Sequence, residues 1–129
     1  MSVQLERIGS VAAFSFHGEL TREYAPELET AVEQHFRSEE GAAVAVLGLA
    51  GVGRVDSKGL ETLLQVSRMM RDRGLPARLF GVTPNVLTVL RITRLLPNFE
   101  VHETLEEAVR AARQGLPGPR DLSPVSAER

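Results

Sequence analysis

The feature that most constrains the fold is an apolar run over residues 42–47, in which apolar and polar side chains do not alternate. A strand with this pattern is buried on both faces, which places it in the middle of a sheet that helices cover. A glycine-containing loop follows the run, and then a long amphipathic segment over residues 60–73. We therefore expect a strand, a loop and a helix at the centre of an α/β structure.

The segments on either side continue this alternation of strands and helices. Residues 3–8 and 11–16 are typical of two strands that Gly9-Ser10 joins into a hairpin. A helical stripe of apolar residues follows over residues 21–37, and Pro26 sets the start of the regular helix near Ala25. The other expected elements are a strand over 77–82, a helix from Thr83-Pro84 to about residue 93, a short strand over 99–101, and a helix after a capping sequence that starts at Thr104.

These segments predict the order β-β-α-β-α-β-α-β-α, an α/β fold with a mixed, mostly parallel sheet of about five strands and about four helices. The length of 129 residues suits one domain. From Gln114 the periodicity ends, and glycine and proline crowd into a polar stretch. We predict a folded domain over residues 1–113 and a flexible tail over residues 114–129.

Composition narrows the function further. Cysteine is absent, which leaves no disulfide framework, thiolate zinc site or cysteine nucleophile. The net charge of −2 gives no electrostatic reason to expect nucleic acid or an anionic membrane as a partner. No apolar run approaches the ~20 residues that span a bilayer, and the N-terminus lacks the pattern of a secretory signal. We expect a cytoplasmic protein that neither inserts into membranes nor contacts nucleic acid directly.

The sequence offers only incomplete motifs for catalysis. Gly51-Val52-Gly53 lies between a strand and a helix, but the third glycine of a dinucleotide-binding motif would fall at Asp56. Ser57-Lys58-Gly59 reverses the order that a phosphate-binding loop requires. The three histidines show no ligand spacing, and Gly-x-Ser-x-Gly does not occur. We predict no enzyme, no cofactor and no metal site, and keep a nucleotide-binding protein as a third alternative.

The junction over residues 55–60 is the predicted functional site. Asp56 and Ser57 are both good N-cap residues for the helix that follows, and a helix N-terminus favours negative charge. Gly59 leaves the backbone open to close approach by another molecule. The simpler interpretation is that Asp56 or Ser57 is only a cap; the other is that this junction is a switch or a docking point.

One ridge of the same helix is a candidate contact surface. At ~100° per residue, most apolar residues of this segment share one broad face. Met69 falls outside that face, on a ridge with Lys58, Thr62 and Gln65. Single exposed apolar residues are common, so Met69 is either incidental or part of a contact surface that starts at Lys58.

Four features in order resemble the STAS domain family, the family of anti-sigma factor antagonists. Residues 16–20, Phe-His-Gly-Glu-Leu, resemble its strand followed by Gly-Glu-Leu, and residues 43–49 resemble its central apolar strand. Residues 55–60, Val-Asp-Ser-Lys-Gly-Leu, resemble its Asp-Ser-Ser/Thr-Gly-Leu signature. Residues 74–82 and 86–96 resemble its next strand and helix. The resemblance covers residues 3–113 and implies a STAS-like fold, a small sheet with helices packed on it.

The resemblance implies a bacterial partner-switching pathway that regulates transcription. Its best-known members bind an anti-sigma factor that is also a serine kinase, which releases them by phosphorylating the second hydroxyl residue of the signature. This chain has Lys58 at that position, and Ser57 is the phosphorylation candidate that remains. The protein therefore binds its partner constitutively, is modified at Ser57, or belongs to a branch without a switch.

We accordingly predict a protein-interaction module that binds a kinase-type anti-sigma factor. The alternative is a non-switching STAS subunit of a transporter or a signalling scaffold, and a homodimer stays open. The predicted partner-binding residues belong to the loop and to the ridge of the helix: Gly53, Asp56, Ser57, Lys58, Gly59, Glu61, Thr62, Gln65 and Met69.

Overall fold

Strands and helices follow one another along the chain in the predicted order. The computed structural model describes residues 2–38 and 44–114. One element was not predicted, a 3₁₀ helix before the last strand. The elements are β1 (Ser2–Ile8), β2 (Val11–His17), α1 (Ala25–Ser38), β3 (Val44–Gly51), α2 (Ser57–Asp72), β4 (Arg78–Phe80), α3 (Pro84–Ile92), the 3₁₀ helix η1 (Leu96–Asn98), β5 (Glu100–His102) and α4 (Leu105–Arg113).

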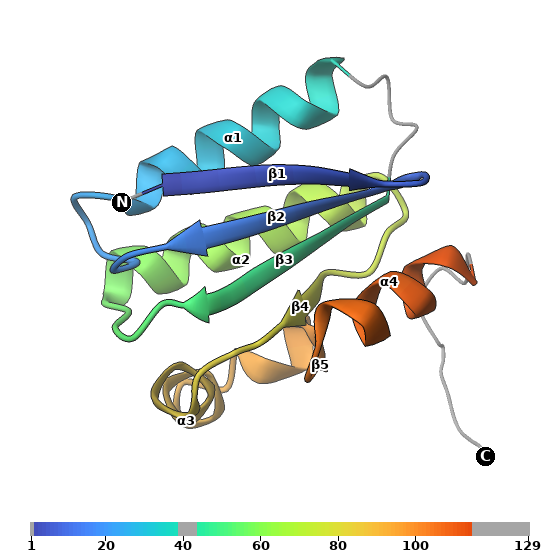
Figure 1. Ribbon diagram of the computed structural model, residues 1–129. Helices are drawn as coiled ribbons and strands as arrows, with labels where there is room; N and C mark the ends of the chain where they lie inside the picture. Colours follow the sequence, from blue (N-terminus) through green and yellow to red (C-terminus); the bar gives the residue numbers. More distant parts are fainter. Residues whose placement is uncertain (1, 39–43, 115–129) are drawn as a thin grey trace.

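The sheet runs in the order β1-β2-β3-β4-β5 (Figure 1). β1 pairs with β2 in antiparallel register, whereas all the later neighbours are parallel. This confirms a mixed, mostly parallel sheet, and β1 lies at its edge. The carboxyl ends of β2 and β3 lie side by side, so the loops after them emerge at the same edge of the sheet.

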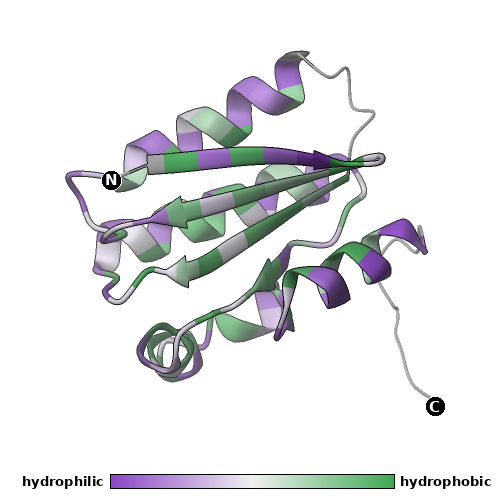
Figure 2. Cartoon of the chain, in the orientation of Figure 1, coloured by the Kyte–Doolittle hydropathy of each residue, from purple (hydrophilic) through white to green (hydrophobic). Residues whose placement is uncertain are grey.

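Helices cover both faces of the sheet, as the apolar run requires. Residues of α1, α2 and α3 share one core with Phe14, Phe16 and Leu47, while α4 packs on the other face against Val11 and Val46. Figure 1 shows α4 on the side of the sheet opposite to α1 and α2, and Figure 2 shows β2 and β3 as largely hydrophobic. The prediction of a strand buried on both faces is therefore confirmed for the part of the run that the structure describes, and β3 continues past it to Gly51.

The later strands are shorter than predicted or slightly displaced. β4 ends at Phe80, because Gly81 has a positive φ of 67° and turns the chain out of the sheet. β5 begins one residue later than expected, at Glu100. At the C-terminus, Gln114 caps α4, so the fold extends one residue into the predicted tail. The rest of that tail, residues 115–129, lies outside the described residues.

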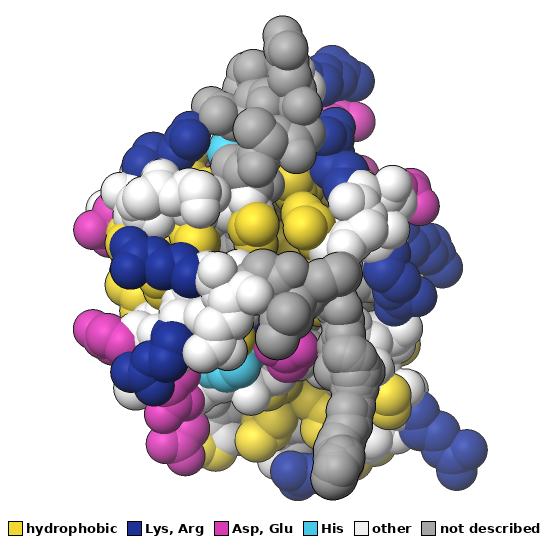
Figure 3. Space-filling model, turned by 90° about the vertical axis from the view of Figure 1, so that its right-hand side faces the viewer, with side chains coloured by type: hydrophobic (Ala, Val, Ile, Leu, Met, Phe, Trp, Pro, Cys, Tyr) yellow, Lys and Arg dark blue, Asp and Glu magenta, His cyan; other side chains and the backbone are white. Residues whose placement is uncertain are grey.

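Charges of both signs are spread over the surface. The face in Figure 3 shows basic and acidic side chains around the periphery with apolar side chains between them.

A cluster of charged side chains joins β4 to β5, and its arginine, Arg78, is only 4% exposed. Glu100 Oε1 accepts a hydrogen bond from Arg78 Nε at 2.8 Å and lies 2.9 Å from His102 Nε2. The hydrogen bond with His102 and then the contact with Arg78 lower the pKa of Glu100 to about 2, although burial opposes the shift.

We expect this cluster to make stability depend on pH below neutrality. The folded-state pKa of Glu100 lies below its ordinary value of 4.5, so its carboxylate stabilises the fold fully above that value. The contribution is lost progressively as the pH falls from 4.5 towards about 2. Urea midpoints measured across this range should fall less steeply in Glu100→Gln than in the wild type. The same substitution at the exposed Glu106 is the control, and an equal slope in Glu100→Gln would contradict the prediction.

Candidate functional site

Two loops at the carboxyl edge of the sheet are hydrogen-bonded to each other. One is the β2–α1 loop, residues 18–24, and the other is the β3–α2 loop, residues 52–56. Leu20 and Val55 form an isolated parallel bridge between them. The backbone hydrogen bonds that join the loops and their flanks are Gly18 N–H to Gly51 O (3.1 Å), Leu20 N–H to Arg54 O (3.0 Å) and Asp56 N–H to Leu20 O (3.3 Å). The loops therefore form one surface, which we call the loop platform.

Asp56 holds both loops at once. It is the N-cap of α2, and its Oδ1 accepts the Gly59 N–H at 2.8 Å. Its Oδ2 accepts the Arg22 N–H of the other loop at 2.9 Å. These backbone donors, Arg22 first and Gly59 next, lower the pKa of Asp56. The predicted cap is confirmed at Asp56, whereas Ser57 is the first residue of the helix.

Gly59 is approached closely, but by its own chain. The residue is buried, and a β-carbon placed there would overlap the carbonyl oxygen of Leu20 and lie 2.7 Å from Val55 Cγ2. The expectation that another molecule approaches this backbone is therefore wrong. At Gly53, by contrast, a β-carbon would meet nothing within 4 Å, and the residue is exposed. Gly53 is thus the glycine that leaves the loop platform open.

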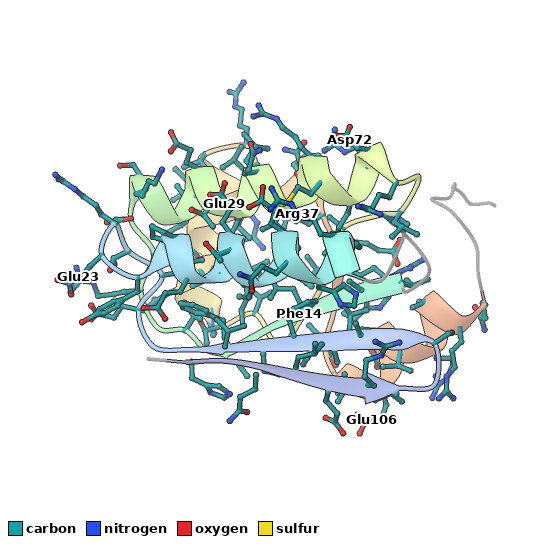
Figure 4. The ribbon with its side chains drawn as sticks, turned by 90° about the horizontal axis from the view of Figure 1, so that it is seen from above. Phe14, Glu23, Glu29, Arg37, Asp72 and Glu106 are labelled. Carbon is teal, nitrogen blue, oxygen red and sulfur yellow. The ribbon has the colours of Figure 1, made fainter. Side chains whose placement is uncertain are left out.

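The predicted contact ridge of α2 is largely turned towards α1. Figure 4 shows the two helices side by side, with Glu29 on the side of α1 that faces α2. Thr62 is only 1% exposed, and Met69 packs on the core, where it lines a hollow with Phe36. The placement of Thr62 on an exposed ridge is wrong. Helical periodicity gives the direction of a side chain around the helix axis, but it does not reveal which other element packs on that side. Gln65 is half-buried on the same side.

The start of α2 presents Ser57, Lys58 and Glu61. Ser57 and Glu61 are exposed, and Ser57 has no hydrogen-bond partner for its hydroxyl within the described part of the chain. Lys58 Nζ lies 2.7 Å from Glu61 Oε1. This hydrogen bond raises the pKa of Lys58 and lowers that of Glu61. Glu61 thus offsets the positive charge that Lys58 adds to the N-terminus of the helix.

An acidic hollow lies beside Asp56. It has a volume of about 580 Å³ and is lined by Glu19, Thr21, Arg22, Glu23, Tyr24 and Asp56. A hydrogen bond with Glu23 raises the pKa of Tyr24, and Arg54 lies 3.5 Å from Glu19. Three carboxylates against one arginine in its lining make the hollow suited to a cationic side chain.

Sequence reasoning missed the β2–α1 half of this platform. The only signal in it was Gly-Glu-Leu at residues 18–20, which entered through the family resemblance alone. Thr83 was also missed as a support: its Oγ1 does not cap α3 as expected, but donates to the Val52 carbonyl at 2.8 Å. That bond fixes the loop before α2 against the loop before α3.

The described residues contain neither a cluster of metal ligands nor a membrane-spanning helix. Within residues 2–38 and 44–114, no group of three or more histidine, aspartate or glutamate side chains could hold a metal ion. No helix in the same part of the chain is long and apolar enough to cross a membrane.

Comparisons with known proteins agree with this fold. Residues 2–108 match the STAS domain family. An anti-sigma factor antagonist from Mycobacterium paratuberculosis is 24% identical, with a TM-score of 0.75 over 87% of this chain and 93% of that one. An anti-sigma-factor antagonist (STAS) domain protein from Planctomyces limnophilus is 18% identical, with a TM-score of 0.72 over 86% and 97%. A sulfate transporter family protein from Wolinella succinogenes is 16% identical, with a TM-score of 0.69 over 83% and 88%. No curated protein sequence matches the chain.

Proposed function

The chain belongs to the STAS domain family, and from this we propose that it is an anti-sigma factor antagonist that binds a kinase-type anti-sigma factor. Binding would release a sigma factor and so regulate transcription in a bacterial cytoplasm. The observation that supports this most is the loop platform: Asp56 stands at the family's signature position and ties two loops into one exposed surface. A rigid surface of this kind lets a partner bind with little loss of conformational entropy.

We propose that the partner contacts the open part of this platform. Gly53 and Ser57 offer exposed surface, and Lys58 with Glu61 offers a charge pair at the helix start. The acidic hollow beside Asp56 would receive a lysine or arginine of the partner. Gln65 and Met69 lie further along α2 as a flank, while Gly59 and Thr62 shape the platform from inside.

Ser57 is the phosphorylation site that we propose. Its side chain is exposed, and Asp56 rather than Ser57 serves as the cap, so the hydroxyl is not needed for folding. A phosphate there would add about two negative charges next to Asp56 and Glu61. We expect that change to weaken binding, because the phosphate repels these neighbouring carboxylates and is costly to desolvate in an interface.

We expect this protein to co-purify with a kinase-type anti-sigma factor from the native cytoplasm or from co-expression. Incubation of the complex with ATP should add the mass of one phosphate and release the protein, and Ser57→Ala should stay bound and unmodified. Lys58→Ser restores the hydroxyl of the family signature and should add a second acceptor. A complex that stays unmodified in the wild type and in both variants would mean constitutive binding. Failure to form any complex would overturn the proposed function.

The alternative function is a non-switching subunit of a transporter or a signalling scaffold. Two observations favour it: Lys58 cannot accept the family's phosphate, and one structural relative is a sulfate transporter family protein. Recovery of transporter subunits in the same pull-down, with no anti-sigma factor, would establish this alternative instead.

A further inference from the structure

A long part of the chain carries arginines and almost no acidic residue. Residues 73–99 contain four arginines and neither Asp nor Glu, and α2 adds Arg68 and Arg71 between Glu61 and Asp72. Two of these six arginines are already engaged. Arg78 is buried against Glu100, and the Arg73 guanidinium lies 4.6 Å from the centre of the Phe36 ring. The other four, Arg68, Arg71, Arg91 and Arg94, are exposed.

Three of these four arginines flank the same short element. Arg71 Nη2 donates to Asn98 Oδ1 of η1 at 2.7 Å, which links the end of α2 to the segment that follows α3. Arg91 lies in the last turn of α3, and Arg94 precedes η1 by two residues. Within the described part of the chain, none of the four has an acidic side chain within 4 Å. Arginines therefore outnumber acidic side chains in this region, in which Asp72 is also exposed.

Among residues 2–38 and 44–114, the most exposed of the large apolar side chains lies inside this basic region. Ile92 is 73% exposed, compared with 49% for Leu5 and 39% for Val101. It stands between Arg91 and Arg94 in sequence, at the last position of α3. One exposed isoleucine is unremarkable by itself, but exposed apolar side chains together with arginines are typical of protein interfaces. We call Arg68, Arg71, Arg91, Ile92 and Arg94 the arginine surface.

The backbone of Arg94 points to a role for its side chain. After α2, Gly74 takes a φ of 75°, and the next residue, Leu75, donates to the Met70 carbonyl. After α3, Arg94 takes the same kind of conformation, with a φ of 63°, and Leu95 donates to Leu90. Glycine is favoured at this position because other residues are strained there. Gly74 follows α2 at this position, whereas Arg94 follows α3. The backbone of Arg94 is therefore strained at a residue that carries an exposed guanidinium group.

We propose that the arginine surface is a second docking site, and that its partner is a protein segment in which carboxylates flank an apolar side chain. Guanidinium groups bind carboxylates in a bidentate manner, and that of Arg71 is already positioned by Asn98. A membrane would need no such positioning and more than one exposed apolar side chain. Arg71 lies about 21 Å from Ser57 along the axis of α2, so this site is independent of the loop platform.

The test is a titration of ¹⁵N-labelled protein with a short synthetic peptide in which Asp and Glu flank one leucine. We expect shifts in the amides of residues 68–71 and 91–98, and not in those of the loop platform. Arg91→Gln with Arg94→Gln should weaken binding at least about fivefold at low salt. The matched control is Arg110→Gln with Arg113→Gln, which removes two charges from the last turn of α4 on the other face of the sheet. Equal weakening by both pairs would overturn the proposal.

Arg94→Gly separates docking from stability. It should raise Tm, because glycine relieves the strained φ, and at the same time weaken the peptide. Unchanged peptide affinity in this variant would overturn the proposal. The proposal would also be overturned if the peptide left the spectrum unchanged while vesicles containing phosphatidylserine bound through the same arginines. Concentration-dependent dimerisation that Arg91→Gln with Arg94→Gln abolishes would also overturn it, because the partner would then be a second copy.

Discussion

Replacing Gly59 with alanine is expected to lower the free energy of unfolding by about 3 kcal/mol and to abolish docking at the loop platform. The new β-carbon would overlap the carbonyl oxygen of Leu20 and crowd Val55. That carbonyl also accepts the Asp56 N–H, so relief of the overlap must separate the two loops. Alanine is otherwise the better helix former by about 1 kcal/mol, so helix propensity alone predicts the opposite sign.

Gly53→Ala is the matched control for this prediction. The same methyl group is added three residues before Asp56, but nothing lies within 4 Å of its position. Urea unfolding monitored by circular dichroism should place Gly53→Ala within about 0.5 kcal/mol of the wild type. If Gly59→Ala is as stable as Gly53→Ala, the close approach of Leu20 to α2 is not what fixes the loops.

Much of the fold was predictable because the signals are local. The apolar run that continues into β3 predicts a strand covered on both faces, and Asp56 ahead of an amphipathic segment predicts a capped helix. The strand after Pro76 was predicted too long, since the positive φ of Gly81 that ends β4 leaves no mark in the apolar pattern. Element type followed from periodicity, whereas element ends depended on backbone conformations that the pattern does not encode.

The candidate site was predictable only in its β3–α2 half. The signature around Asp56 is contiguous in sequence, so it could be found without the structure. The β2–α1 half joins it through Arg22 N–H, which is 34 residues away from Asp56 and carries no side-chain signal. Thr62 was misplaced for a related reason. A polar side chain on the flank of a helix usually indicates exposure to solvent, but here α1 covers that flank and buries Thr62.

Substitution of Asp56 tests whether the docking surface depends on the hydrogen bond between the two loops or only on the cap of α2. Asp56→Ala removes both acceptors, one for Gly59 and one for Arg22, and should lower Tm by several degrees and partner affinity at least about tenfold. Asp56→Ser keeps a good N-cap oxygen for α2 but is too short to hold Arg22 as well. We therefore expect Asp56→Ser to recover most of the lost Tm and little of the lost affinity.

The control for this pair is α4, another helix with a side-chain cap. Thr104 Oγ1 accepts the Glu107 N–H at 3.2 Å at the start of α4, on the far side of the sheet. Thr104→Ala should destabilise the fold by about 1 kcal/mol and leave partner affinity unchanged. Thermal melts and calorimetric titration with the partner from the pull-down measure both quantities in all variants. If affinity follows Tm across Asp56→Ala, Asp56→Ser and Thr104→Ala, the cap acts only through stability. If Asp56→Ser is stable and does not bind, the contact between Asp56 and Arg22 is what shapes the platform.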